Sequence, residues 1–232
     1  MKAVVLSSGG VDSTTCLAMA VNEIGKENVV TLSFEYGQRH AKELNCAEKV
    51  AKFYRVRHFV FNLTHIFSFS NCSLLAKSEE HPEHASYAEQ IARDGEGKVA
   101  TYVPFRNGLM LSAGAALAQS LYPEEACQIW IGAHADDAAG NAYADCSEAF
   151  NRSMGEAIRI GTYDLVTLRA PLNRWNKAQV VKKGLELGVP YALTWSCYEG
   201  GEKACGQCGT CIDRLEAFRA NGVEDPIEYM KK

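Results

Sequence analysis

The chain has 232 residues, of which 47% are hydrophobic and 22% charged, and its formal net charge is −4. This composition is typical of a folded globular protein and argues against disorder. The mild acidity argues against a protein built mainly to bind nucleic acid, and no apolar run approaches the ~18 residues of a membrane span. The first residues lack the apolar core of a signal peptide, so we expect a cytoplasmic protein whose thiols stay reduced.

Short apolar segments and amphipathic segments alternate along the first part of the chain. The predicted strands are residues 2–6, 28–34 and 57–63, and the predicted helices between them are residues 13–24 and 40–54. Strands that alternate with helices at this close spacing are joined by right-handed crossovers into a parallel sheet. The polar stretch 64–98 breaks the rhythm and predicts a long insertion or mobile loop.

The second part of the chain continues the alternation and ends in a cysteine-rich segment. The predicted helices are 107–121, 147–160, 176–187 and 212–221, the predicted strands are 128–132 and 165–168, and the predicted loop is 140–145. The pattern predicts an α/β fold with a doubly wound, mainly parallel sheet. We expect residues 1–190 to form this α/β domain and residues 191–232 to form a small segment packed on it.

A loop rich in glycine and hydroxyl residues, Ser7-Ser8-Gly9-Gly10-Val11-Asp12-Ser13-Thr14-Thr15, joins the first strand to the first helix. Glycines let backbone amides approach an anion, and a helix N-terminus carries roughly half a positive charge. The loop therefore predicts a phosphate site at the carboxyl edge of the sheet. It lacks the patterns of a Walker loop and of a dinucleotide fingerprint. The alternative is a tight turn in which Asp12 or Ser13 caps the helix.

Four of the nine cysteines, Cys197, Cys205, Cys208 and Cys211, lie close together near the C-terminus. Two successive C-x-x-C steps let short turns direct the sulfurs to a common centre, and four cysteines without histidine suit a closed tetrahedral zinc site. An iron–sulfur cluster and a redox dithiol are the alternatives. Because four thiolates leave no open coordination position, we expect one structural zinc ion per chain.

Several sequence strings together resemble one enzyme family. They are the loop at 7–15, Tyr36-Gly37-Gln38-Arg39-His40, Pro104-Phe105-Arg106-Asn107, Trp195-Ser196-Cys197-Tyr198 and Asp213-Arg214-Leu215-Glu216-Ala217-Phe218. The loop resembles the signature of the PP-loop ATP pyrophosphatase superfamily, whose fold is adenine nucleotide alpha hydrolase-like. The combination resembles the 7-cyano-7-deazaguanine synthase family of queuosine biosynthesis, from about residue 2 to residue 226.

The resemblance implies an ATP-dependent carbon–nitrogen ligase. AMP transfer would activate the carboxylate of 7-carboxy-7-deazaguanine, ammonia would form an amide, and a second ATP would activate the amide to leave the nitrile. Such catalysis depends on positioning and charge stabilisation. The implied cofactors are ATP, Mg²⁺ and one structural Zn²⁺, and the implied assembly is a homodimer without nucleic acid or membrane partners. The nucleotide products implied are either AMP with pyrophosphate or ADP with phosphate.

The resemblance also assigns residues to the site. The ATP-binding positions are Ser7, Ser8, Gly9, Gly10, Val11, Asp12, Ser13, Thr14, Thr15, Cys16 and Leu17, and the zinc ligands are Cys197, Cys205, Cys208 and Cys211. The expected catalytic residues are Asp12, Ser13, Arg106 and Lys177. The expected substrate contacts are Arg39, His40, Asn107, Asp137, Tyr143 and Asp145.

Most assignments outside the loop and the cysteines have a structural alternative. The alternatives are a solvated helix start for Arg39, a helix cap for His40, an N-cap for Asn107, a surface lysine for Lys177 and solvated loop acids for Asp137 and Asp145. Segment 132–146 also departs from the family pattern, because Asn141-Ala142 is inserted and Ala144 stands where proline is expected. This departure concerns recognition of the base and not the use of ATP.

Two other functions fit the loop alone. A PP-loop enzyme that modifies tRNA usually brings a basic RNA-binding region, which this acidic chain lacks. A zinc-containing nucleotide-binding module would bind ATP without turnover. Product formation from ATP, ammonium and the carboxylated base separates all three.

Overall fold

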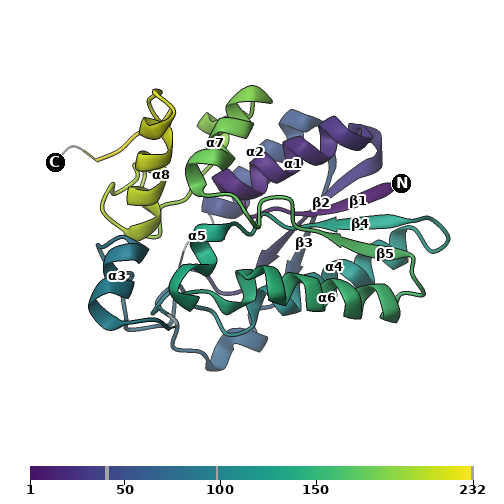
Figure 1. The fold of residues 1–232 in the computed structure, drawn as a ribbon, viewed down its shortest axis with the longest axis horizontal. Coiled ribbons are helices and arrows are strands. Elements are labelled where there is room, and N and C mark those ends of the chain that lie inside the picture. The colour runs from purple at the N-terminus through teal and green to yellow at the C-terminus, as the bar shows by residue number, and fades with distance from the viewer. Residues whose placement is uncertain (40–41, 98, 231–232) are drawn as a thin grey trace.

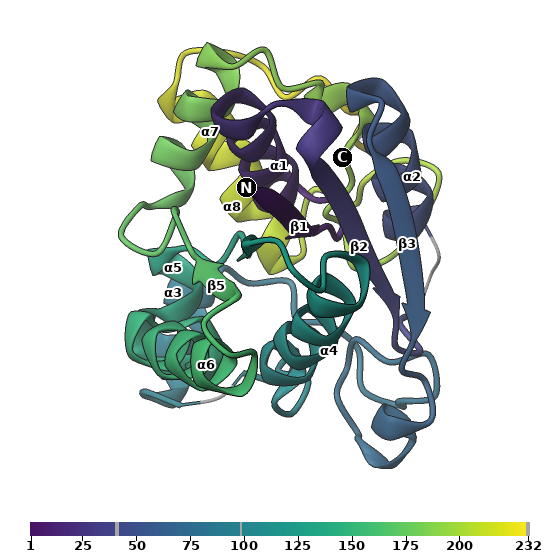
Figure 2. The same cartoon turned by 90° about the vertical axis from the view of Figure 1, so that its right-hand side faces the viewer.

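The computed structural model describes residues 1–39, 42–97 and 99–230, which form a parallel sheet with helices on both faces (Figures 1 and 2). The strands are β1 (Lys2–Leu6), β2 (Val29–Glu35), β3 (Arg57–Asn62), β4 (Cys127–Trp130) and β5 (Val166–Arg169). Among the described residues they pair in parallel in the order β3-β2-β1-β4-β5. Strands buried on both faces read as near-continuous apolar runs, as Ala3–Leu6 of β1 does. The predicted doubly wound α/β fold is confirmed.

Helices connect the strands. They are α1 (Val11–Ile24), α2 (Lys42–Tyr54), α3 (Tyr87–Asp94), α4 (Arg106–Leu121), α5 (Ala135–Ala138), α6 (Glu148–Gly161), α7 (Lys177–Glu186) and α8 (Gly209–Ala220). Short 3-10 turns lie at Lys26–Asn28, Ile66–Phe69, Ala139–Asn141, Ala144–Cys146 and Tyr191–Leu193. The predicted helices are present, with ends that differ by a few residues. In the described ranges, no helix has the length and apolar character needed to cross a membrane.

Alternate residues of β1 supply two hydrophobic cores. Val4 and Leu6 pack on the side of α4 and α6, whereas Ala3 and Val5 pack on the side of α1, α7 and α8. This division follows from the strand geometry, because successive side chains point to opposite faces. Phe218 of α8 lies in the second core, so the C-terminal segment packs on the same core as the sheet.

Residues 64–97 are more structured than the loop that was predicted at 64–98. Helix α3 begins with a capping box in which Ser86 and Glu89 bond to each other's backbone N–H. Leu74 and Leu75 are buried in the first core. The loop prediction was therefore wrong for these parts, because so short a helix gives little periodicity. The loop predicted at 140–145 also contains helical turns, at Ala139–Asn141 and Ala144–Cys146.

A buried ion pair joins α8 to the residues that follow it. The side chains of Arg214 and Asp225 are 0% and 1% exposed, and the Arg214 guanidinium donates two hydrogen bonds to the Asp225 carboxylate, at 2.6 and 2.9 Å. A third nitrogen of Arg214 donates to Thr194 Oγ1 at 2.9 Å and to Ser196 Oγ at 3.2 Å. The guanidinium therefore links α8, the preceding segment and the C-terminal tail.

We predict that Asp225→Ala lowers the free energy of unfolding by about 3–5 kcal/mol, because it leaves the Arg214 charge buried without its partner. Urea denaturation measures this loss. The control is Glu228→Ala, which removes an exposed ion pair to Lys203 of 2.9 Å and should cost less than about 1 kcal/mol. Equal losses in the two variants would contradict the prediction.

Candidate active site

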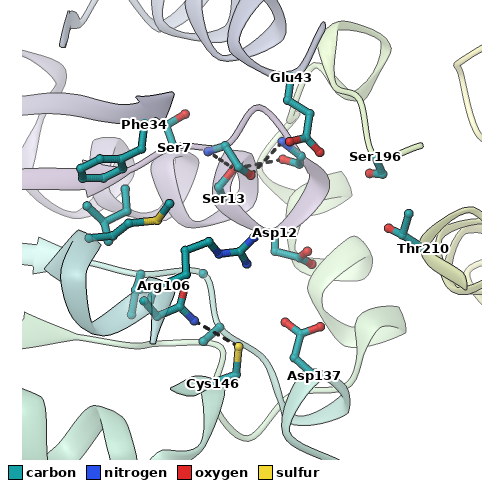
Figure 3. A pocket seen from close by; sticks show the side chains of 18 of the residues that line it. Ser7, Asp12, Ser13, Phe34, Glu43, Arg106, Asp137, Cys146, Ser196 and Thr210 are labelled. Atoms are coloured by element: carbon teal, nitrogen blue, oxygen red, sulfur yellow. Dashed lines mark hydrogen bonds between the residues drawn. The ribbon is translucent and has the colours of Figure 1, made fainter. Parts of the chain in front are cut away.

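A cavity of about 240 Å³ opens at the carboxyl ends of β1, β2 and β4 (Figure 3). Parallel α/β sheets bind ligands at this edge. The predicted site residues that line the cavity are Ser7, Ser8, Gly10, Asp12, Ser13, Arg39, Arg106, Asn107, Asp137, Tyr143 and Lys177. The predicted contact of His40 lies outside the described residues. Eleven scattered positions of the sequence thus meet at one cavity.

Gly9 is held tightly at the base of the loop after β1. Its φ is +82°, and a Cβ at this position would lie 2.3 Å from the carbonyl oxygen of Glu43. Its own carbonyl accepts a hydrogen bond of 2.9 Å from the backbone N–H of Trp195. Only glycine meets both the positive φ and the close approach, so the loop is packed directly against α2.

The N-terminus of α1 is not capped by a side chain. The N-cap is Gly10, whose backbone is extended, so the alternative with Asp12 or Ser13 as N-cap was wrong. Ser13 Oγ instead accepts a hydrogen bond from the Ser8 N–H at 3.2 Å and lies 3.0 Å from Ser8 Oγ. The first N–H groups of the helix have no intrahelical partner, which is the arrangement that favours a bound anion.

The remaining predicted ATP positions lie beneath the loop and do not line the cavity. Val11, Cys16 and Leu17 are buried in the core on the α1 side of the sheet. Thr14 is buried, and Thr15 Oγ1 donates to the carbonyl of Val11 at 2.9 Å. These residues hold the helix that carries the loop, because their side chains point to the core instead of the cavity.

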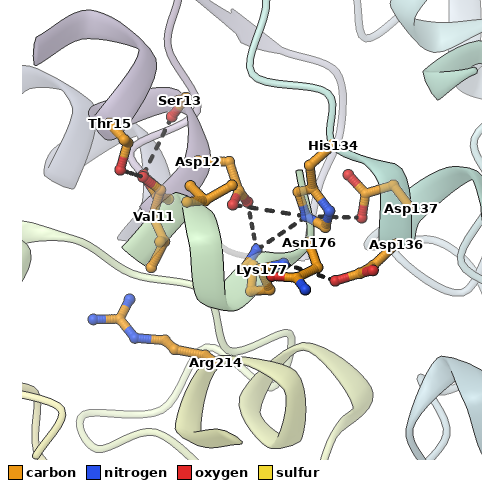
Figure 4. A network of polar contacts seen from close by, with 12 residues as sticks. Val11, Asp12, Ser13, Thr15, His134, Asp136, Asp137, Asn176, Lys177 and Arg214 are labelled. Carbon is orange, nitrogen blue, oxygen red and sulfur yellow. Dashed lines mark hydrogen bonds and ion pairs between the residues drawn. The ribbon is translucent and has the colours of Figure 1, made fainter. Parts of the chain in front are cut away.

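Lys177, Asp12, His134 and Asp137 form a polar network beside the loop (Figure 4). Lys177 Nζ lies 2.5 Å from Asp12 Oδ2 and 3.4 Å from His134 Nε2, which itself lies 3.3 Å from Asp137 Oδ1. Burial acts to raise the pKa of Asp12, but the charges of Lys177 and His134 lower it overall. The Lys177 side chain is 13% exposed, so the surface-lysine alternative was wrong.

Arg106 and Asn107 begin α4 after Phe105, whose φ of +53° is left-handed. Arg106 Nη1 donates to the Tyr36 hydroxyl at 3.3 Å. Asn107 is not the N-cap, because that position is Phe105. Its backbone N–H donates to Asp145 Oδ2 at 2.9 Å. Asp145 is buried behind the cavity wall, so the structure places it as a support for the start of α4 and not in contact with the cavity.

The Arg39 guanidinium is occupied by the chain itself. It donates to the carbonyl oxygens of Ser73 at 2.6 Å, Ser78 at 2.9 Å and Glu80. Arg39 therefore holds segment 73–80 beside the cavity through its Nε and one Nη. The Tyr143 hydroxyl is hydrogen-bonded to Thr101, which fixes its ring in the wall.

The cavity residues that were not predicted include His134, Glu43 and Asp213. His134 follows β4 closely, and a polar residue after a parallel strand is a signal that could have found it. Glu43 lies in the first turn of α2, where an acid is usually interpreted as a partner of the helix dipole, and Asp213 lies in the second turn of α8. Burial raises the pKa of Glu43 to about 7 and that of Asp213 to about 6.

The four clustered cysteines form a candidate metal centre. The sulfur atoms of Cys197, Cys205, Cys208 and Cys211 lie within 4.8 Å of one another, and all four residues are buried and free of disulfides. The N–H groups of Gln207 and Cys208 donate to Cys205 Sγ at 3.4 and 3.3 Å, and such bonds stabilise a thiolate. Hydrogen bonds from the Cys208 and Cys211 thiols lower the pKa of Cys197. The cluster fits one tetrahedral ion with no open position.

Comparisons with known proteins agree along the whole chain. A family model described as queuosine biosynthesis protein QueC matches residues 2–222. A 7-cyano-7-deazaguanine synthase from Caldicellulosiruptor saccharolyticus is 43% identical over 229 residues, which cover 99% of this chain and 96% of that protein. A 7-cyano-7-deazaguanine synthase from Archaeoglobus fulgidus is 42% identical over 228 residues, which cover 98% of this chain and 90% of that protein.

Among solved structures, the chain is similar to a glutamine-dependent NAD⁺ synthetase from Acinetobacter baumannii in complex with adenosine diphosphate. The TM-score is 0.50 at 16% sequence identity, over 84% of this chain and 32% of that chain. At this level of identity the similarity shows a shared fold.

We predict that Gly9→Ala lowers the free energy of unfolding by about 2–4 kcal/mol, because the new Cβ meets the α2 backbone and φ is positive. Gly10→Ala is the matched control. Its φ is −84°, and its Cβ would meet only Ser8 Oγ at 3.3 Å and the Trp195 carbonyl oxygen at 3.5 Å. Urea denaturation should show a clearly smaller decrease in the free energy of unfolding for Gly10→Ala than for Gly9→Ala. Similar decreases in the two variants would contradict a steric role for the contact between Gly9 and α2.

We predict that Cys208→Ser loses bound metal and lowers the melting temperature together, because one of four ligands is removed from a site that stabilises the fold. Metal analysis of the purified protein and thermal denaturation measure the two effects. Cys127→Ser, which alters a buried cysteine of β4 outside the cluster, should keep its metal. Retention of one metal ion per chain in Cys208→Ser would exclude Cys208 as a ligand.

Proposed function

The chain belongs to the queuosine biosynthesis protein QueC family, and on this premise we propose that it is an ATP-dependent ligase that forms 7-cyano-7-deazaguanine from 7-carboxy-7-deazaguanine and ammonia. The observation that carries the ATP-dependent part is the uncapped N-terminus of α1, which opens onto a cavity that also holds Lys177 and Arg106. A helix N-terminus with two nearby cations suits the triphosphate of ATP.

The proposed chemistry has two activations. A carboxylate oxygen of the substrate attacks the α-phosphorus of ATP, pyrophosphate leaves, and ammonia then displaces AMP to form the amide and release a proton. The amide oxygen attacks the α-phosphorus of a second ATP, pyrophosphate leaves, and loss of AMP and of both amide protons gives the nitrile. Because AMP turns a poor oxygen leaving group into a good one, this route needs no covalent attachment to the protein.

The loop residues and the nearby cations have distinct proposed roles. Ser8, Ser13 and the first N–H groups of α1 hold the pyrophosphate portion, and Mg²⁺ when bound supplies charge neutralisation for it. Lys177 and Arg106 stabilise the negative charge that develops at the α-phosphorus. Asp12 keeps Lys177 ionised and positioned, as the short contact between the two side chains supports.

Zinc is the proposed occupant of the cysteine cluster, with a structural role, because four thiolates suit a closed tetrahedral site. An iron assay and a visible spectrum of anaerobically purified protein test this identity, since an iron–sulfur cluster absorbs in the visible range. The proposal also includes a homodimer, which the family resemblance supports, and a cytoplasmic location, which the nine free cysteines support.

The proposed function is tested by incubating the protein with ATP, Mg²⁺, ammonium and 7-carboxy-7-deazaguanine. We expect the nitrile by mass spectrometry, with two AMP and two pyrophosphate released for each nitrile formed. ATP consumption that requires tRNA would instead support a tRNA-modifying enzyme. Binding of ATP without cleavage would support a nucleotide-binding module.

We predict that Ser13→Ala lowers kcat by about 10- to 1000-fold, because a group that stabilises charge during the reaction is lost. The melting temperature should stay close to that of the wild type, since Ser13 bonds only within the loop. The matched control is Ser120→Ala, which removes an exposed hydroxyl on α4 that bonds to the Ala116 carbonyl. An unchanged kcat in Ser13→Ala would remove this residue from the catalytic site.

A further inference from the structure

Recognition of the base requires an acceptor pair at the cavity. The pyrimidinone ring of a 7-deazaguanine carries its N1–H and 2-amino groups side by side, so it presents two parallel donors. A carboxylate presents two acceptor oxygens and can take both hydrogen bonds at once. Donors left unpaired in a closed site cost binding free energy. The carboxyl groups that line the cavity are Asp12, Glu43, Asp137 and Asp213.

Two of these carboxylates already have partners in the polar network. Asp12 is paired with Lys177 at 2.5 Å, and Asp137 lies 3.3 Å from His134. Asp213 interacts electrostatically with Lys177 and His134, so it belongs to the same corner of the cavity. The carboxyl groups of these three residues therefore interact with Lys177 and His134 beside the phosphate loop.

Glu43 is arranged differently. Among the residues that the structure describes, its carboxylate takes part in no hydrogen bond or ion pair, and it points into the cavity (Figure 3). Arg106 is its main electrostatic partner, yet the Arg106 guanidinium bonds to the Tyr36 hydroxyl and forms no ion pair with Glu43. An acid and a guanidinium thus face one cavity without contact, which leaves room for a polar ligand between them.

The backbone of Glu43 is fixed to the phosphate loop. Its carbonyl oxygen packs against Gly9 so closely that a Cβ on Gly9 would lie only 2.3 Å from this oxygen. A side chain anchored in this way holds a ligand at a constant distance from the loop, which is the condition for efficient transfer between two bound reactants. The aromatic side chains of Tyr36, Trp195 and Tyr198 line the same cavity and offer flat apolar surface to a planar ring.

We propose that Glu43 recognises the 2-aminopyrimidinone edge of the substrate, with its two carboxylate oxygens accepting hydrogen bonds from N1–H and the 2-amino group. This inference rests on the proposed function and assigns the base-specific contact within it. Glu43 is then a specificity-determining residue that acts on binding of the base and leaves ATP binding to the loop.

The test measures steady-state kinetics with the natural base and with an analogue that lacks the 2-amino group, 7-carboxy-7-deazahypoxanthine. For the wild type we expect the analogue to raise KM by roughly 10- to 100-fold, the range of one bidentate contact. Glu43→Gln should raise KM for the natural base by a similar factor, because its amide N–H₂ faces a donor. It should discriminate little between the two bases, while KM for ATP changes by less than about twofold.

A second variant and matched controls separate recognition from folding. Glu43→Asp keeps the charge but withdraws the oxygens, so it should also raise KM for the base while the melting temperature and metal content stay unchanged. Glu48→Gln alters an exposed acid of the same helix, paired with Lys52 at 2.6 Å, and should leave all constants unchanged.

Three results would overturn the inference. One is a Glu43→Gln variant with unchanged KM and unchanged discrimination between the two bases. Another is that Asp213→Asn or Asp137→Asn loses the discrimination between the two bases while Glu43→Gln keeps it. This result would assign the contact with the base to Asp213 or Asp137. The third is absence of the nitrile product with the wild type, which would overturn the proposed function and this inference with it.

Discussion

The contact between Gly9 and the backbone of α2 is the constraint on which the site depends. No side chain fits there, because a Cβ would lie 2.3 Å from one backbone atom and 2.7 Å from another. The Trp195 N–H closes the other side of the same residue. Gly132 approaches the loop from β4, where a Cβ would lie 3.0 Å from the backbone of Asp12. The loop is therefore enclosed by backbone from three distant parts of the chain, and its geometry is set before any ligand arrives.

The charged residues of the cavity lie where helices begin. Parallel strands end at one edge of the sheet, so α1, α2, α4 and α7 all start there and bring Asp12, Glu43, Arg106 and Lys177 to one cavity. The positive ends of these helices add to the two cations and favour an anionic ligand. The acids are held among these charges, which keeps Asp12 ionised in spite of its burial. The same edge is closed by the cysteine-rich segment, whose Ser196 and Thr210 line the cavity.

Local sequence predicted the parts of the molecule whose structure depends on local chemistry. The strands followed from short apolar runs, and the phosphate loop followed from glycines and hydroxyl residues between a strand and a helix. The C-x-x-C spacing predicted that the four cysteine sulfurs lie close together. Prediction failed where a side chain is used by a distant segment. Asp145 binds the start of α4 and does not line the cavity, although it had been expected to face the substrate. Arg39 lines the cavity as expected, but it also donates hydrogen bonds to the backbone at 73–80, which no local pattern indicated.

By itself the sequence determined the α/β alternation, the loop for an anion, the cysteine cluster and the family resemblance, because each is written in adjacent residues or in short spacings. Only the tertiary structure decided which polar side chains reach the cavity. Whether His134 and Glu43 line the cavity, and whether Lys177 is buried beside Asp12, depends on how helices from separate parts of the chain meet at the sheet edge. Such meetings are set by packing between residues far apart in the chain, and no local pattern records them.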